Sequence, residues 1–231
     1  MCVCVCVCVC VYVSVCVCVC VCARARVCAR VCVCVCGVSA CVRVSMCAHV
    51  LQPCIHFIPF SFSEGLRCAS RARVHAVQCN FWGCGGAGVR VGGGARCDME
   101  EVCVHQSALQ GLVCGGRSVC VCSGLVLVGC GRGAAVMCPG AAAGGASTLE
   151  LTNCRVTHAS GHGITVSDDA CAKMTGCRIT NCVLSGVNIT TTQHVALLSS
   201  SISACSSHGV HCSGSGACSI IDSIINACTG V

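Results

Sequence analysis

A short segment of the chain holds the residue types that acid–base chemistry on a sugar would need. Residues 160–169 read SGHGITVSDD, so His162 lies between two glycines and is followed by the carboxylates Asp168 and Asp169. Inverting hydrolysis of a glycosidic bond uses one carboxylic acid to protonate the leaving oxygen and one carboxylate to activate water. Whether this segment is such a site depends on whether it is unique and on the elements that hold it.

Other residues could bind a ligand without reacting with it. Arg155 and Arg178 could form a stacked pair that holds a carboxylate or phosphate, or they could stay solvated. The segment SSHGVHC gathers His208, His211 and Cys212, but residues 51–231 contain no Cys-x-x-Cys pair with structural zinc spacing. We therefore expect no metal and no other cofactor. The candidate binding residues are Arg155, Arg178, His162, His208, Asp168 and Asp169.

Internal repetition indicates which elements position these residues. The segments LELTNCRVTHASGHGITV, AKMTGCRITNCVLSGVNI and VALLSSSISACSSHGVHC align with a period of 23 residues. Alternating apolar residues with a glycine at one place in every period predict stacked coils of short β-strands around a shared core. The glycines are expected at bends whose backbone angles only a residue without Cβ adopts at low cost. The aligned columns are Val156, Ile179, Ile202 and Ile225; Leu151, Met174, Leu197 and Ile220; and Gly163, Gly186 and Gly209.

The same offsets continue upstream. Coils are expected around Gly88 and Gly111, and Gly65 is read as one further turn. A coil around Gly133 would have as its inward residues Val119, Val121, Val126, Ala134 and Val136. The composition PGAAAGGAS at residues 139–147 predicts a loop inserted between two coils.

The region from about residue 51 onward resembles the right-handed parallel β-helix repeat family of the pectin-lyase-like superfamily. The resemblance rests on the 23-residue period with its apolar and glycine columns. It implies an all-β, right-handed parallel β-helix of about seven or eight coils. That superfamily includes polysaccharide lyases and hydrolases, periplasmic metal-insertion factors and F-box ubiquitin-ligase adaptors, so the fold alone does not select a function.

Comparison with the polygalacturonases of that superfamily argues against catalysis at the GHG segment. In those enzymes NTD and DD motifs precede GHG, and RIK follows on a later coil. Here NTD is missing, the two carboxylates follow GHG, and CRIT at residues 177–180 lacks the lysine. Ser185 and His208 fall in the column of His162, so histidine recurs there. We interpret the segment as a coil turn, and the dispersed acids also disfavour a calcium-dependent lyase.

The first 36 residues are a nearly uniform alternation of Cys and Val that carries 13 of the 34 cysteines. Such a sequence is what a TG dinucleotide repeat encodes. We divide the chain into a low-complexity tract and linker at 1–50, disordered or a gene-model artefact, and a β-helix domain at 51–231. Residues 1–22 are uncharged, but the arginines follow them rather than precede them, which makes secretion or membrane attachment the minority alternative.

Cysteine usage favours a reducing, intracellular compartment, because several cysteines replace Val or Leu at inward positions. These are Cys68, Cys97, Cys114, Cys212 and Cys218. The net charge of +6 arises largely from four arginines before residue 50, and aromatic residues for base stacking are few. We therefore expect no nucleic-acid partner.

These observations favour a non-catalytic scaffold whose ladder surface binds a protein, peptide or glycan partner. The alternative is a carbohydrate-active enzyme whose site residues are missing or lie outside this chain. Several acids converging on one groove would indicate the enzyme, and a polar or aromatic ladder would indicate the binding module. Because the chain stops after the bend residue Gly230, we expect a fragment of a longer protein that self-associates through an uncapped last coil.

Overall fold

The fold was analysed in a computed structural model. It describes residues 4–10, 15–22, 31–35, 42–44, 64–69, 71–131, 134–139 and 146–229. In these residues every regular element is a β-strand. They contain no apolar helix long enough to cross a membrane.

The described parts of the Cys/Val tract form a small antiparallel sheet. Its strands are β1 (Cys4–Cys10), β2 (Val15–Cys22) and β3 (Val31–Val35), in the order β1-β2-β3. The period-two alternation of the tract therefore appears as strand. The following β4 (Val42–Val44) pairs in parallel with β5 (Leu66–Cys68).

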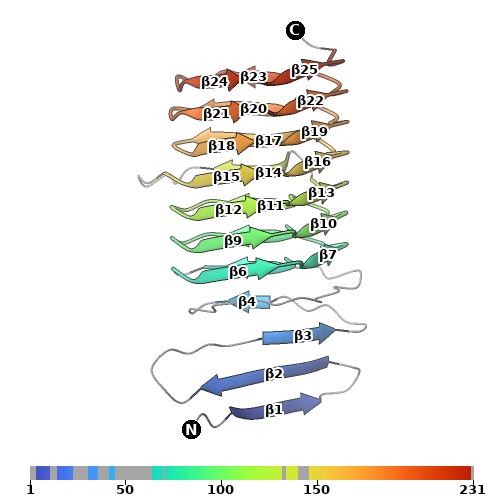
Figure 1. Ribbon diagram of the computed structural model, residues 1–231, viewed down its shortest axis with the longest axis vertical. Helices are drawn as coiled ribbons and strands as arrows, with labels where there is room; N and C mark the ends of the chain where they lie inside the picture. The colour runs from blue at the N-terminus through green and yellow to red at the C-terminus, as the bar shows by residue number, and fades with distance from the viewer. Residues whose placement is uncertain are drawn as a thin grey trace.

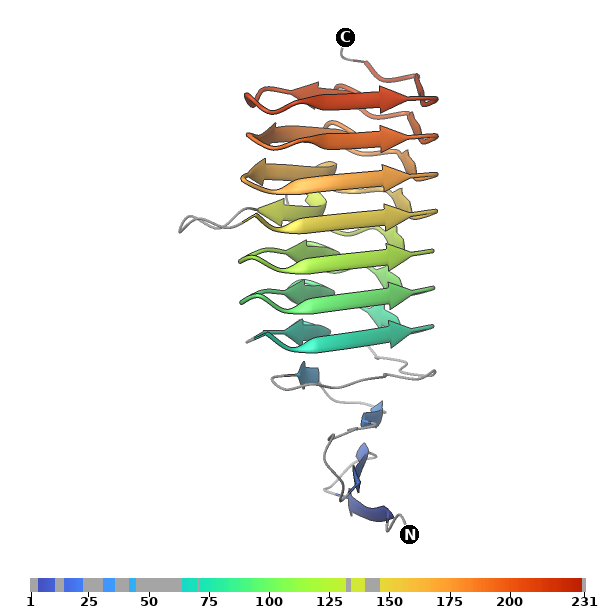
Figure 2. The same ribbon diagram turned by 60° about the vertical axis from the view of Figure 1, so that its left-hand side comes forward.

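From β5 onward the chain forms a parallel β-solenoid of seven coils, each contributing one strand to each of three sheets (Figure 1). The first sheet contains β4 and then β5 (Leu66–Cys68), β8 (Val89–Val91), β11 (Leu112–Cys114), β14 (Ala134–Pro139), β17 (His162–Asp168), β20 (Val187–Thr191) and β23 (Val210–Cys212). The second contains β6 (Arg73–Val77), β9 (Arg96–Glu100), β12 (Val119–Ser123), β15 (Thr148–Thr152), β18 (Cys171–Thr175), β21 (Val195–Leu198) and β24 (Cys218–Ile221). The third contains β7 (Asn80–Trp82), β10 (Cys103–His105), β13 (Val126–Val128), β16 (Arg155–Thr157), β19 (Arg178–Thr180), β22 (Ser201–Ser203) and β25 (Ile224–Asn226). Figure 2 shows the coils stacked one above another along the long axis.

The predicted apolar columns are confirmed as in-register stacks. Val156 pairs with Ile179, Ile179 with Ile202 and Ile202 with Ile225. The first three are at most 2 % exposed, but Ile225 is 42 % exposed. The prediction of a fully buried column is therefore wrong at its last member, because β25 has a neighbouring strand on one side only.

Close approach, rather than backbone conformation, explains the glycine column. A Cβ built on Gly163 would lie 2.5 Å from the carbonyl oxygen of Gly186 and 2.6 Å from Cγ2 of Ile179. Gly186 and Gly209 are blocked in the same way by Ile202 and Ile225. None of the three has a positive φ angle. The expected reason for the glycines, unusual backbone angles, is therefore wrong.

Left-handed backbone conformation occurs instead in two other columns, at the corners on either side of the third sheet. The φ angles there lie between +46° and +66°. The corner entering the third sheet has Gln78, Glu101, Gly124, Asn153, Gly176, Ser199 and Asp222. The corner leaving it has Gly83, Gln106, Gly129, His158, Asn181, Ala204 and Ala227. Most members are not glycine, so a search for glycine does not find these bends.

The register predicted for the third coil is wrong by one residue. Cys120 pairs with Cys97 and Cys122 with Met99, and both cysteines are buried. Leu127 continues the same inner surface, whereas the residues predicted to point inward are half-exposed: Val119, Val121 and Val126. Because Val and Cys alternate here and both are apolar, hydrophobicity does not distinguish the two faces.

The glycine column is also displaced in the fourth coil. Val136 pairs with Leu112 on one side and with Ile164 on the other, and Ala134 pairs with His162, whereas the prediction placed Ala134 level with Ile164. The inward positions predicted for Ala134 and Val136 are confirmed, since both are buried. Gly133 and most of the predicted loop at 139–147 lie outside the described residues, as do Gly230 and Val231.

The burial of the inward cysteines also differs between the interior coils and the last coil. Cys68, Cys97 and Cys114 are buried, as predicted. Cys212 is exposed and Cys218 only partly buried, so the predicted burial of these two is wrong. They occupy inward columns, but no described strand covers β23 and β24 on their outer side.

Candidate binding surface

His162 is part of a coil turn. It begins β17, and its Nδ1 accepts a hydrogen bond of 3.2 Å from the backbone N–H of Ser185 on the next coil. The backbone N–H of Gly163 donates to the carbonyl of Ser185, and that of Gly186 donates to the carbonyl of His208. Burial, followed by the charge of His211, lowers the pKa of His162. A neutral imidazole that accepts a backbone hydrogen bond supports the interpretation of this segment as one ordinary turn of the solenoid.

The two aspartates next to this segment fix the bend after β17. Asp168 has a φ of 57°, and its carbonyl accepts bonds from the Thr191 hydroxyl (2.7 Å) and the Thr192 N–H (2.8 Å). The hydroxyl of Thr192 also donates to Oδ1 of Asp169 at 2.9 Å. Each aspartate therefore contacts the following coil, in a bonding pattern typical of a corner between strands.

Arg155 and Arg178 are brought together by the register of the third sheet. They begin β16 and β19, are direct neighbours in the parallel pairing, and are both exposed. Among the described residues, no ion pair joins these arginines to Asp168 or Asp169. The two aspartates lie at the end of β17, where the chain passes from the first sheet to the second. The candidate residues therefore occupy three separate corners and do not form one pocket.

His208 and His211 approach each other on the last coil without forming a metal site. Their ring centroids are 5.2 Å apart, and Nδ1 of His211 lies 3.0 Å from Oδ1 of Asn188. Nδ1 of His208 lies 2.9 Å from the Ser207 hydroxyl. No group of three or more His, Cys, Asp or Glu among the described residues could hold a metal ion.

The most distinctive surface is the outer face of the third sheet, which we call the ladder face. Trp82 and His105 stack in adjacent coils with ring centroids 4.7 Å apart and an interplanar angle of 26°, and Trp82 is 48 % exposed. In-register pairing continues this aromatic column through valine to hydroxyl residues. Its later members are Val128, Thr157, Thr180, Ser203 and Asn226.

A parallel column on the ladder face contains the two arginines, and neither column contains an acid. Its members are Asn80, Cys103, Val126, Arg155, Arg178, Ser201 and Ile224. The seven strands of the sheet contain no Asp or Glu at any position. The Trp82–His105 column was not among the sequence predictions, although the two residues are one period apart and each follows an inward residue.

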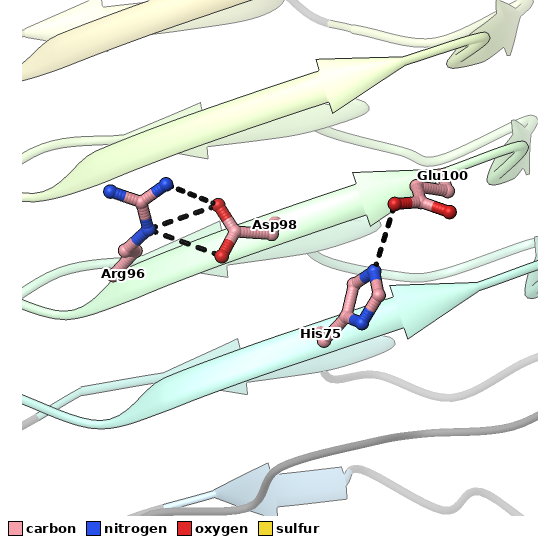
Figure 3. A network of polar contacts seen from close by, with 4 residues as sticks. All are labelled: His75, Arg96, Asp98 and Glu100. Atoms are coloured by element: carbon pink, nitrogen blue, oxygen red, sulfur yellow. Dashed lines mark hydrogen bonds and ion pairs between the residues drawn. The ribbon is translucent and has the colours of Figure 1, made fainter.

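Two acids of the second sheet, Asp98 and Glu100, are paired with basic residues (Figure 3). Nη2 of Arg96 lies 3.0 Å from Oδ1 of Asp98, and Nε2 of His75 lies 3.1 Å from Oε1 of Glu100. The hydrogen bond to Asp98 raises the pKa of Arg96. These pairs are exposed on β6 and β9, and each of the two carboxylates has its own basic partner.

Comparison with known proteins identifies the fold family. Residues 135–231 match the family described as "Right handed beta helix region". No curated protein and no solved structure matches the sequence significantly. The match covers the last coils of a solenoid whose earlier coils have the same three-strand repeat. Residues 135–231 are therefore similar to the right-handed β-helix family, and the whole solenoid has the corresponding parallel β-helix fold.

Proposed function

We propose that the protein is a non-catalytic scaffold that binds an extended partner, either a protein, a peptide or a glycan, on the ladder face. The observation that carries the proposal is the stack of the exposed Trp82 on the half-buried His105, continued by in-register hydroxyl residues. An aromatic ring offers a flat apolar contact, and hydroxyls repeated once per coil suit a ligand with a regular repeat.

The charge of the ladder face restricts the partner. Arg155 and Arg178 are its only charged residues apart from any proton on His105, as the strand sequences show. A neutral or anionic chain would meet no like charge there, whereas a cationic chain would be repelled. The proposed partner is therefore neutral or negatively charged.

Trp82 is the single tryptophan of the chain, so its fluorescence reports directly on the ladder face. Neutral oligosaccharides, acidic oligosaccharides and acidic peptides would be titrated against the full chain. A bound ligand is expected to shift the emission of Trp82 to shorter wavelength. Calorimetry should show that Trp82→Ala weakens binding roughly tenfold, the loss expected for one aromatic contact.

The matched control is Thr165→Ala, which removes a half-exposed hydroxyl from the first sheet. This variant should bind like the unaltered chain. Equal losses in Thr165→Ala and Trp82→Ala would contradict binding at the ladder face. Release of reducing ends or unsaturated products from any oligosaccharide would instead support the enzyme alternative.

A further inference from the structure

Two cysteines face each other at the corner between the first and second sheets in the last coil. Cys212 ends β23 and continues the inner column of Val166 and Ile189. Cys218 begins β24 and continues the inner column that contains Val195. Residues 213–217 join the two strands.

The turn between these cysteines is held against the preceding coil. The Ser213 N–H donates to the carbonyl of Ile189 at 2.9 Å, and the Gly216 N–H donates to that of Thr191 at 3.0 Å. A Cβ on Gly214 or Gly216 would collide with backbone atoms of that coil. The two cysteines are therefore placed by a tightly docked turn.

The thiols contact each other but differ in access to solvent. Cys212 is exposed and Cys218 is partly buried. Burial raises the pKa of Cys218 to about 11, with the charge of Cys212 and a hydrogen bond to it adding to the shift. Cys218 therefore stays protonated at neutral pH.

The third coil contains the same pair in a buried setting. Cys114 ends β11 and Cys120 lies on β12, at the corner between the first and second sheets. Their thiols are also hydrogen-bonded, and both residues are 0 % exposed. The two pairs share position and chemistry and differ in access, which provides an internal control.

We propose that Cys212 and Cys218 form an oxidisable dithiol that closes to a disulfide when a hydroperoxide reaches the last coil. The exposed sulfur of Cys212, as thiolate, attacks a peroxide oxygen and breaks the O–O bond, giving a sulfenic acid and hydroxide. The hydroxide takes a proton from solvent, in place of the one that the Cys212 thiol had released, and leaves as one water. Cys218 then attacks the sulfenic sulfur. The S–S bond forms, the S–O bond breaks, and the proton of Cys218 leaves with the hydroxyl as a second water. Two thiols lose two electrons to the peroxide.

The experiment treats the reduced full chain with hydrogen peroxide, alkylates the remaining thiols, and maps tryptic peptides by mass spectrometry. No Lys or Arg follows Arg178, so both cysteines lie in the single peptide 179–231. This peptide should lose two hydrogens and two alkylation sites, with fragment ions locating the link to 212 and 218. Because trypsin cleaves after Arg117, a Cys114–Cys120 disulfide would join two peptides; that species should appear only later.

Two variants separate this pair from the other cysteines of the peptide. Cys212→Ser and Cys218→Ser should each abolish the loss of two hydrogens, while Cys228→Ser should leave it unchanged. The inference would be overturned if peptide 179–231 of either of the first two variants still lost two hydrogens at the original rate. Oxidation of Cys114 and Cys120 as fast as that of Cys212 and Cys218 would also overturn it.

Discussion

Gly163 shows how the spacing between coils selects a residue type. Its missing Cβ leaves room for the Gly186 carbonyl and for the side chain of Ile179, and Sγ of Cys182 would lie 3.0 Å from an added Cβ. The Gly186 carbonyl accepts the hydrogen bond of Ile164 and is held in place by it. A larger residue at 163 would therefore have to separate two coils.

Substituting Gly163→Ala should lower the free energy of unfolding by about 1–3 kcal/mol, the usual cost of overpacking a tight interior. Chemical denaturation followed by circular dichroism measures this change. The control is Gly92→Ala, because the nearest atom to a Cβ there is the Gly115 carbonyl oxygen at 3.9 Å. Gly92→Ala should change stability by no more than about 0.5 kcal/mol. Equal losses in the two variants would contradict the packing explanation.

At the scale of the strand, the direction of β12 decides which residues enter the core. Cys120 and Cys122 are buried, whereas Val119 and Val121 are half-exposed. A shift of one residue would exchange the two sets completely. The observed set is fixed by in-register pairing with β9 and β15, whose inner residues are unambiguous.

Matched lysine substitutions test this register. Cys122→Lys would put an unpaired charge into the core and should cost at least about 3 kcal/mol of stability or prevent folding. Val121→Lys should be tolerated, because its side chain can extend into solvent. Thermal unfolding of both variants measures the difference. The register would be wrong if Val121→Lys were the more damaging of the two.

The sequence predicts the repeating strands and most of their apolar columns, but it misses features that depend on spatial neighbours. The apolar columns through Val156 and Leu151 follow from composition and period alone. The faces of β12 do not, because Val and Cys are similarly apolar. The left-handed corners are also missed, because residues as different as Asn153 and Ala204 occupy them. The ladder face could have been predicted by extending the alternation one residue beyond the inward column to Trp82 and His105.

At the scale of the whole molecule, the last coil presents a concentrated apolar surface. Four isoleucines there are between 42 % and 63 % exposed: Ile220, Ile221, Ile224 and Ile225. β23, β24 and β25 are each the terminal strand of their sheet as described, so their outer backbone groups are open to a further strand. We propose that the chain self-associates through these isoleucines of β24 and β25, which leaves Cys212 at the end of β23 accessible.

Placing charge on this surface should weaken self-association. Ile220→Lys and Ile225→Lys put ammonium groups on the inner columns of the last coil, which another copy would have to bury. Sedimentation velocity should show a shift from oligomer toward monomer. Thr165→Lys, on the first sheet, adds the same charge elsewhere and should leave the distribution unchanged. A shift as large with Thr165→Lys would exclude association through the last coil.

In-register stacking of the coils builds both the core and the ladder face. It brings His105 against Trp82, 23 residues away in the chain. Burial lowers the pKa of His105 below its ordinary value of 6.5. The unfolded chain therefore takes up the proton more readily, and this residue's contribution lowers stability as the pH falls through 6.5 and below.

The most direct measurement is the emission of Trp82 as a function of pH. A protonated imidazole quenches a stacked indole. As the pH is lowered, the emission of Trp82 should therefore fall in one step with its midpoint below pH 6.5. His105→Gln should abolish that step, while His75→Gln, on the second sheet, should preserve it. If His105→Gln retained the same step, Trp82 and His105 would not be neighbours, and the stacking of the coils described above would be contradicted.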